Sequence, residues 1–219
     1  MTKITRRALV ASAAALAIAG PALAAGQKSV EAGKVFPFLE NYLKLPAPER
    51  NRFTLAYYMT RDGKPAANQK GWIGAGATRT PVSTGPDGRV LCLPTLAQLQ
   101  AKAPLVLDAP ESAKFGMNMV VEAAMRPGLE LDAAELAMAI AQAAQGAKKA
   151  AGLLGVMVPK FEVAAFKGVS SGSAVMADGK VVALPVLKGT PVYNPAKLKG
   201  ARALKFAKAP SQIILAPAA

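Results

Sequence analysis

The pattern that most restricts the fold of this chain is one long stretch with helical periodicity, which lies among short stretches typical of β-strands. Asp132 can cap a helix and Glu135 can complete a capping box, and the helix is expected to end at Gly152 or Gly155. Its apolar face consists of Leu136, Ile140, Ala143, Ala144 and Ala147. Because alanine allows close approach, the pattern predicts a helix packed on a sheet.

Runs of alternating or β-branched apolar residues precede and follow this helix. Strands are expected over residues 53–59, 89–94, 105–107, 114–125, 161–166, 173–176, 180–187, 204–206 and 213–215. Asp62-Gly63 suits a tight hairpin turn because glycine supplies a positive φ. Residues 27–34 have no apolar stripe and are expected to be a flexible lead-in, whereas 35–45 and 95–102 predict short helices.

These elements predict an α+β protein, mainly antiparallel β-sheet and sandwich-like, with one long amphipathic helix and a short N-terminal helix. The expected organisation is a leader at 1–24, a helix plus β-rich module at 25–108 and a β-α-β module with a basic C-terminal part at 109–219. Alternatively, the last two ranges form one compact domain.

Residues 1–24 have the layout of a cleavable signal peptide. A basic start containing Arg6-Arg7 precedes an uncharged apolar run, and small residues favour cleavage between Ala24 and Ala25. The apolar run is too short to span a bilayer. The paired arginines resemble the twin-arginine export signal, with the Sec route as the alternative. We therefore expect a periplasmic or secreted protein without a transmembrane segment in its mature part.

One stretch of the sequence repeats. Residues 87–96 (DGRVLCLPTL) align without gaps on residues 178–187 (DGKVVALPVL), 91 positions later. Two explanations are open. Either the chain contains two related modules, or both stretches converge on the sequence that a tight turn before a strand requires.

The turns of the first half resemble those of a known module. The stretch 62–68 (DGKPAAN), followed by 84–94 (TGPDGRVLCLP), resembles small transthyretin-like or carboxypeptidase-regulatory-like β-sandwich modules. The resemblance covers about forty residues of one module. It implies a non-catalytic sandwich and brings no functional residues with it.

The chain has no histidine and only one cysteine, Cys92. This composition excludes catalysis that uses histidine, metal sites that use imidazole, iron–sulfur clusters and an internal disulfide. No cofactor is expected. Cys92 lies in an expected strand, where we predict a buried small side chain. A reactive thiol or a bridge between molecules is the alternative.

Two groups of residues keep a hydrolase as the alternative function. Glu130, Asp132 and Glu135 cluster in sequence, although helix capping explains them. Ser171 or Ser173 could act with a lysine, Lys167 or Lys180, as a Ser-Lys dyad. Whether the chain is an enzyme stays open, with the balance against it.

The charge of the chain is strongly positive, with 27 Lys and Arg against 13 Asp and Glu. The excess lies near the C-terminus, where the candidate anion-binding face consists of Lys197, Lys199, Arg202, Lys205 and Lys208. The sequence predicts an exported, non-enzymatic binding, structural or accessory protein of the bacterial envelope. Its expected partner is an anionic envelope component or a protein, and not nucleic acid. A solvated face that only keeps the protein soluble is the alternative, and the oligomeric state is open.

Overall fold

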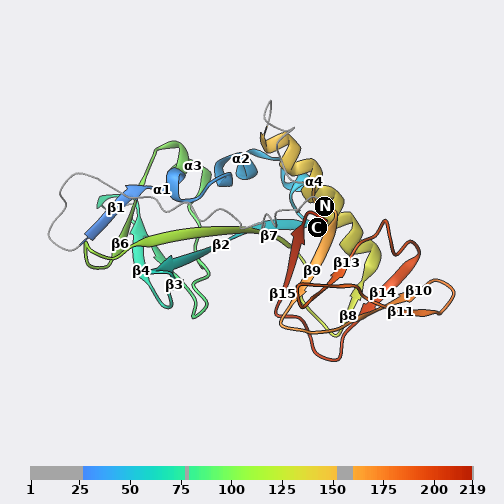
Figure 1. The fold of residues 1–219 in the computed structure, drawn as a ribbon. Coiled ribbons are helices and arrows are strands. Elements are labelled where there is room, and N and C mark those ends of the chain that lie inside the picture. The colour runs from blue at the N-terminus through green and yellow to red at the C-terminus, as the bar shows by residue number, and fades with distance from the viewer. Residues whose placement is uncertain (1–26, 77–78, 152–159, 219) are drawn as a thin grey trace, which may run out of the picture. The chain divides into compact units, whose positions relative to one another are not determined.

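The computed structural model describes residues 27–76, 79–151 and 160–218, which Figure 1 shows as a ribbon. Strands predominate in this part of the chain, and all strand pairs described below are antiparallel. The prediction of a mainly antiparallel protein with one long helix is confirmed for these residues. The expected leader and its cleavage site at Ala24-Ala25 lie outside them.

The contacts of the chain group into two compact units. Unit 1 consists of the residues up to Pro37 together with Tyr57–Met119, and unit 2 consists of Phe38–Ala56 together with Val120–Ala219. The chain therefore passes from one unit to the other three times, within strands β2 (Phe53–Arg61) and β7 (Phe115–Ala123) and at Pro37-Phe38. This grouping differs from the sequence-based division after residue 108.

Unit 1 contains a four-stranded sheet of order β1-β6-β4-β5. Its strands are β1 (Gln27–Glu31), β6 (Pro104–Asp108), β4 (Lys70–Ile73) and β5 (Thr80–Ser83). Residues 27–34 were expected to be a flexible lead-in, and that expectation is wrong. β1 pairs with β6 along its whole length, and Leu105, Val106 and Leu107 of β6 supply the buried side chains. Backbone pairing with an apolar strand thus replaces an apolar pattern in β1 itself.

The helix expected over residues 35–45 is divided into α1 (Ala32–Val35) and α2 (Leu39–Lys44). Pro37 separates them, because proline disfavours a helical conformation in the preceding residue and cannot donate a backbone hydrogen bond. Phe38 then adopts a left-handed conformation with φ 63°. Helix α2 ends before Pro46, and the chain then forms one further turn, the 3-10 helix η1 (Ala47–Glu49).

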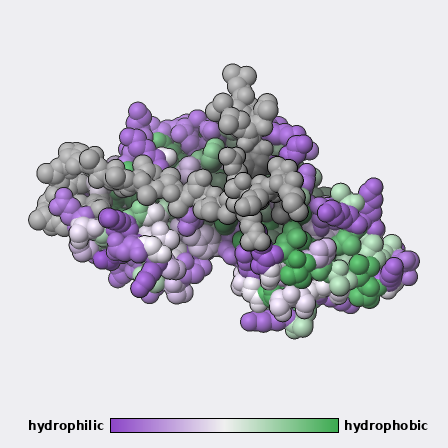
Figure 2. Space-filling view, viewed as in Figure 1, coloured by the Kyte–Doolittle hydropathy of each residue, from purple (hydrophilic) through white to green (hydrophobic). Residues whose placement is uncertain are grey.

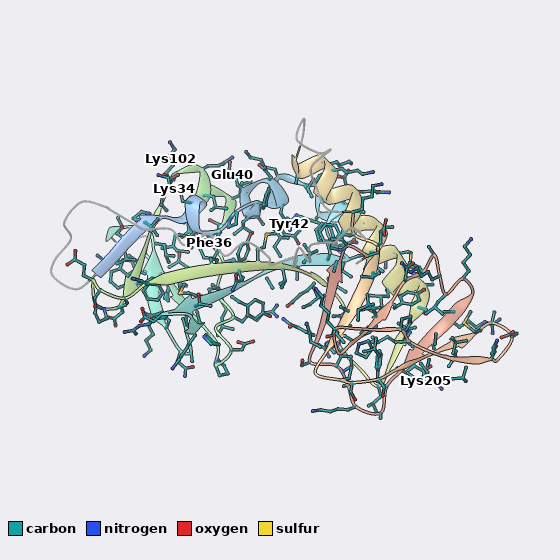
Figure 3. The ribbon with its side chains drawn as sticks, in the orientation of Figure 1. Lys34, Phe36, Glu40, Tyr42, Lys102 and Lys205 are labelled. Atoms are coloured by element: carbon teal, nitrogen blue, oxygen red, sulfur yellow. The ribbon has the colours of Figure 1, made fainter. Side chains whose placement is uncertain are left out.

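The aromatic residues of this region pack separately in the two units. In unit 1, Phe36 lies against Tyr57 with ring centroids 5.1 Å apart, and Figure 3 shows Phe36 below α1. In unit 2, Tyr42 lies 5.4 Å from Phe53. Phe36 and Tyr42, which lie in the segment expected to form one helix, therefore pack in two separate cores.

Local signals in unit 1 are confirmed. Asp62 (φ 52°) and Gly63 (φ 79°) form the turn between β2 and β3 (Lys64–Pro65). Helix α3 (Leu96–Gln100) begins at a capping box, in which Thr95 and Gln98 exchange hydrogen bonds between side chain and backbone at 3.2 and 3.0 Å. The turn and the short helix over residues 95–102 depend on neighbouring residues alone, which is why the sequence indicated them, whereas the capping box at Thr95 was not predicted.

Unit 2 contributes a second four-stranded sheet, of order β11-β10-β14-β8. Its strands are β11 (Val181–Ala183), β10 (Ser173–Met176), β14 (Ala201–Lys205) and β8 (Glu130–Asp132). The third sheet has the order β12-β13-β9-β15-β7-β2-β3. Its remaining strands are β12 (Val186–Leu187), β13 (Thr190–Tyr193), β9 (Val163–Lys167) and β15 (Gln212–Ala216).

The long helix α4 (Ala133–Ala151) packs on strands of unit 2, including β14, β8 and β9. As predicted, Asp132 caps it, accepting a hydrogen bond from the Glu135 N–H at 2.9 Å. Leu136, Ile140 and Ala143 are buried. The expected helix end at Gly152 or Gly155 lies outside the described residues. No helix in the described ranges is both long enough and apolar enough to cross a membrane.

The two Asp-Gly sequences of the repeat, Asp87-Gly88 and Asp178-Gly179, form the same turn, one in each unit. Asp87 accepts a hydrogen bond from the backbone N–H two residues later at 3.0 Å, and Asp178 does the same at 2.9 Å. Gly88 (φ 81°) and Gly179 (φ 85°) adopt the left-handed conformation that such a hairpin requires. The repeated sequence therefore has a repeated local structure.

The strand pairing beyond each turn is also equivalent at first. Thr84 pairs with Val90 in unit 1, and Val175 pairs with Val181 in unit 2. Each residue of the second pair lies 91 positions after its counterpart, as in the sequence repeat. The hairpins then diverge, because strand β11 extends from Val181 to Ala183 in unit 2 whereas residues 91–95, directly after Val90, form no strand.

Candidate functional site

The five basic residues of the candidate anion-binding face are all exposed. Lys197 and Lys199 lie in the turn between β13 and β14, Arg202 and Lys205 belong to β14, and Lys208 lies between β14 and β15. Figure 3 labels Lys205 near β8 and β14, in the sheet that holds both strands. All five residues therefore lie in strand β14 of unit 2 or in the turns on either side of it.

Side-chain alternation divides the residues of β14 between the two faces of its sheet. Lys205 projects from the face opposite to the buried Leu204, whereas Arg202 lies at a register shift between Ala201 and Ala203 that interrupts the alternation. Lys205 is also opposite Glu130 in the register, and its Nζ lies 3.5 Å from Glu130 Oε2. Both side chains of this pair are more than half exposed, at 53% and 61%. Water and salt therefore screen the pair strongly.

The charge around β14 extends further than the five predicted residues. From Gly179 to the last residue, Ala219, the sequence contains no Asp and no Glu. The Lys and Arg residues of this acid-free segment are Lys180, Lys188, Lys197, Lys199, Arg202, Lys205 and Lys208. All seven are exposed. The segment therefore presents positive charge without an acidic residue of its own to neutralise it.

A second feature of this region is an apolar edge that the sequence analysis did not identify. Val181 is 63% exposed, Val186 50% and Leu187 40%, whereas Leu184 between them is only 4% exposed. Figure 2 shows hydrophobic colour gathered over the part of unit 2 where Figure 1 labels β10, β13 and β14. Pro185 was the available signal, because proline within an apolar run favours an edge strand.

The acidic residues considered for a hydrolase have separate structural partners. Glu130 pairs with Lys205, Asp132 caps α4, and the Glu135 carboxylate lies 3.2 Å from Arg52 Nη1. Across the described residues, no three or more Cys, Asp or Glu side chains gather where a metal ion could bind. These contacts engage the three carboxylates at three different places.

The serine-rich loop that was the other hydrolase candidate precedes and enters β10. Ser171 is exposed and Ser173 is half-buried. In the described range 160–218, no hydrogen bond joins either hydroxyl to Lys167 or Lys180. Gly172 packs so closely that a Cβ would lie 2.5 Å from the Phe206 ring. The local sequence is thus explained by packing of this loop on Phe206.

Unit 2 also has an open hollow of about 220 Å³. It is lined by Asn51, Arg52, Ala124, Met125, Glu135 and Ala139. The charges of Arg52 and Glu135 already neutralise each other there. Gln142 further fixes this region, since its Oε1 accepts from the Arg52 N–H at 2.8 Å and its Nε2 donates to Asn51 at 2.8 Å. These hydrogen bonds and this ion pair connect α4 to the residues just before β2.

Cys92 is exposed, so the prediction that it is buried is wrong. The expected strand over residues 89–94 is reduced to two isolated bridges, made by Arg89 and Val90. Leu91 (61% exposed) and Cys92 lie beyond them. The Arg89 guanidinium, a possible neighbour for a thiolate, donates a hydrogen bond to the Tyr58 hydroxyl at 3.0 Å.

Three buried polar side chains belong to the cores. Burial raises the pKa of Tyr57, whose hydroxyl donates to the Pro37 carbonyl at 2.5 Å. Burial, and secondly the charge of Asp132, raise the pKa of Tyr193. The buried Glu122 accepts a hydrogen bond from Gln212 Nε2 at 2.6 Å. Hydrogen bonds of this kind offset the free-energy cost of burying polar groups.

The acid-free segment and its apolar edge are therefore the strongest candidate site. The resemblance of residues 62–94 to transthyretin-like modules stays a prediction. No protein family, curated protein or solved structure matches the chain.

Proposed function

We propose that this chain is an exported protein of the bacterial envelope that binds an anionic partner without catalysing a reaction. The observation that supports the proposal is the acid-free segment from Gly179 to Ala219, with seven exposed Lys and Arg residues. Among the described residues, only Lys205 of these seven has a carboxylate partner, Glu130. Six cations are therefore left to interact with solvent, salt or a partner.

Such uncompensated charge acts mainly on binding and little on folding. An exposed ion pair such as Lys205–Glu130 contributes about 0–1 kcal/mol to stability. A cluster of like charges, by contrast, creates a field of several kT at low salt, which raises the local concentration of anions. The function that fits this distribution is association with an anionic surface or molecule.

The envelope location depends on the export-signal pattern of residues 1–24. Acidic phospholipid, phosphorylated glycolipid and acidic protein are the anionic partners of that compartment.

Sandwich-like packing of the sheets is part of the same proposal. Antiparallel pairing and the two Asp-Gly hairpins support it.

The first experiment measures binding of the purified protein to vesicles of acidic phospholipid and to poly-glutamate. We expect the affinity to fall between about 50 and about 200 mM salt, because the Debye length shortens over that range. Changing Lys197, Lys199, Arg202, Lys205 and Lys208 together to glutamine should weaken binding by about tenfold or more.

A matched control changes five exposed lysines elsewhere to glutamine: Lys64, Lys70, Lys102, Lys114 and Lys148. It removes the same net charge and should retain most of the affinity. An equal loss in both variants would show a general effect of net charge and contradict a specific face. Affinity that does not change with salt would contradict the proposal as a whole.

A further inference from the structure

One short segment forms the free edge of two sheets. β11 is the end strand of the sheet β11-β10-β14-β8, and β12 is the end strand of the sheet that continues with β13 and β9. Only Leu184 and Pro185 separate them. We call residues 180–188 the edge segment. It presents strand backbone from two sheets in succession, and no described strand covers either edge.

The hydrogen-bond pattern identifies which backbone groups of β11 face outward. The Lys180 carbonyl and the Leu184 N–H both bond to the chain of β10, at 2.8 and 2.9 Å. In an antiparallel pair, alternate residues bond to the partner, so Val182 also points toward β10. The N–H and C=O groups of Val181 and Ala183 therefore point to the free edge, where a further strand could pair with them.

Within β11 and β12 the exposed side chains are apolar, and Lys180, Pro185 and Lys188, which are residue types that protect sheet edges, lie outside the two strands. Seven large apolar side chains are exposed among the described residues, and Val181, Val186 and Leu187 are three of them. The buried Leu184 fixes the segment to its unit. Exposed apolar groups beside free strand backbone are the features that a partner strand recognises.

The charge of the surroundings selects the partner. Lys180 and Lys188 begin and end the edge segment and are exposed, and no acidic residue follows Asp178 in the chain. Two copies of this edge would bring like charges together, which opposes self-pairing. A strand with acidic side chains would instead gain attraction along its length.

We propose that an extended acidic peptide adds to β11 as a further strand. Its backbone pairs with Val181 and Ala183, its apolar side chains cover Val181 and Val186, and its carboxylates lie near Lys180. This inference rests on the proposed function, because it names the chemical class of the anionic partner.

The probe is a short synthetic peptide of alternating valine and glutamate. We expect it to bind the protein and to slow hydrogen exchange at the Val181 and Ala183 amides. A peptide of alternating valine and lysine is the charge control. A valine–glutamate peptide with N-methyl groups on alternate amides is the backbone control. Each control peptide should bind at least about tenfold more weakly than the valine–glutamate peptide.

The decisive variant is Ala183→Pro. It removes an N–H that points to the free edge and leaves the bonds between β11 and β10 in place, because Ala183 does not bond to β10. We expect it to weaken peptide binding about tenfold while the circular dichroism spectrum stays unchanged. The matched control Ala183→Ser keeps the N–H and should bind the peptide as the unchanged protein does.

Equal binding by Ala183→Pro and Ala183→Ser would overturn strand addition. Self-association that only Ala183→Pro abolishes, together with no peptide binding, would overturn it in favour of pairing between two copies. A third outcome is that Ala183→Pro binds the peptide as the unchanged protein does and still binds anionic vesicles in a salt-sensitive way. That outcome would reject strand addition and leave the proposed function standing. Failure of the proposed function would be different, since the five-residue glutamine variant would then bind anionic vesicles normally.

Discussion

The two Asp-Gly hairpins share a turn but continue differently. In unit 1, the last bridge is at Val90, and Leu91 and Cys92 are exposed. In unit 2, the equivalent chain continues as β11 and then buries Leu184. The comparison shows that turn residues determine where the chain reverses, whereas the contacts available beyond the turn determine how far the next strand extends.

The surroundings of the two turn glycines also differ. Gly88 lies against β2, where its carbonyl accepts a hydrogen bond from the Met59 N–H at 2.8 Å. A Cβ at Gly88 would lie 2.4 Å from the Met59 carbonyl oxygen. At Gly179, a Cβ would meet nothing within 4 Å. The first turn is therefore packed against another strand, and the second turn is open.

The largest difference is expected between Gly88→Ala and Gly179→Ala. Alanine in the left-handed conformation costs about 1–2 kcal/mol at either position. At Gly88 the backbone overlap adds further strain, so we expect a loss of about 3 kcal/mol or more in the free energy of unfolding. Urea unfolding of both variants measures this. Similar losses would show that the two turns are equally open.

A smaller difference is expected between Leu184→Ala and Leu93→Ala, which occupy equivalent positions of the repeat. Leu184 is buried and Leu93 is half-buried. We expect a loss of about 3 kcal/mol for Leu184→Ala and of about 1 kcal/mol for Leu93→Ala, because the cost rises with the cavity left behind. Thermal and urea unfolding provide the measurement. A greater loss at Leu93 would contradict the different continuation of the two hairpins.

The smallest effect tests what the hairpins share. Asp87→Ala and Asp178→Ala each remove one hydrogen bond from an exposed turn, and each should cost about 0.5–1 kcal/mol. Asp→Asn at the same positions keeps an acceptor oxygen and should cost less. Unfolding free energies that differ clearly between the two alanine variants would indicate that the turns are not equivalent.

Features set by neighbouring residues could be predicted from the sequence. The cap at Asp132, the short helix over residues 95–102 and the turn at Asp62-Gly63 each need only a few adjacent residues. β1 was missed because its order depends on pairing with β6, far along the chain, and not on its own side chains. The division of the expected helix at Pro37 was foreseeable, since proline restricts the residue before it.

The candidate site was predicted only in part. The basic residues near the C-terminus were identified from charge alone, and they are exposed. The edge position of Val181 depends on which strands pair with β11. A run of apolar residues in the sequence does not contain that information. The same reason explains the error at Cys92, because nothing local indicated that the ladder stops at Val90.

The interleaving of the two units has a practical consequence. Any truncation between Phe38 and Met119 removes residues from both, so neither unit can be excised as one uninterrupted fragment. During synthesis, unit 1 is complete once Met119 has emerged, while Phe38–Ala56 must wait for residues made afterwards. A minimal version of either unit would have to be assembled from two pieces of chain or rejoined by a new linker.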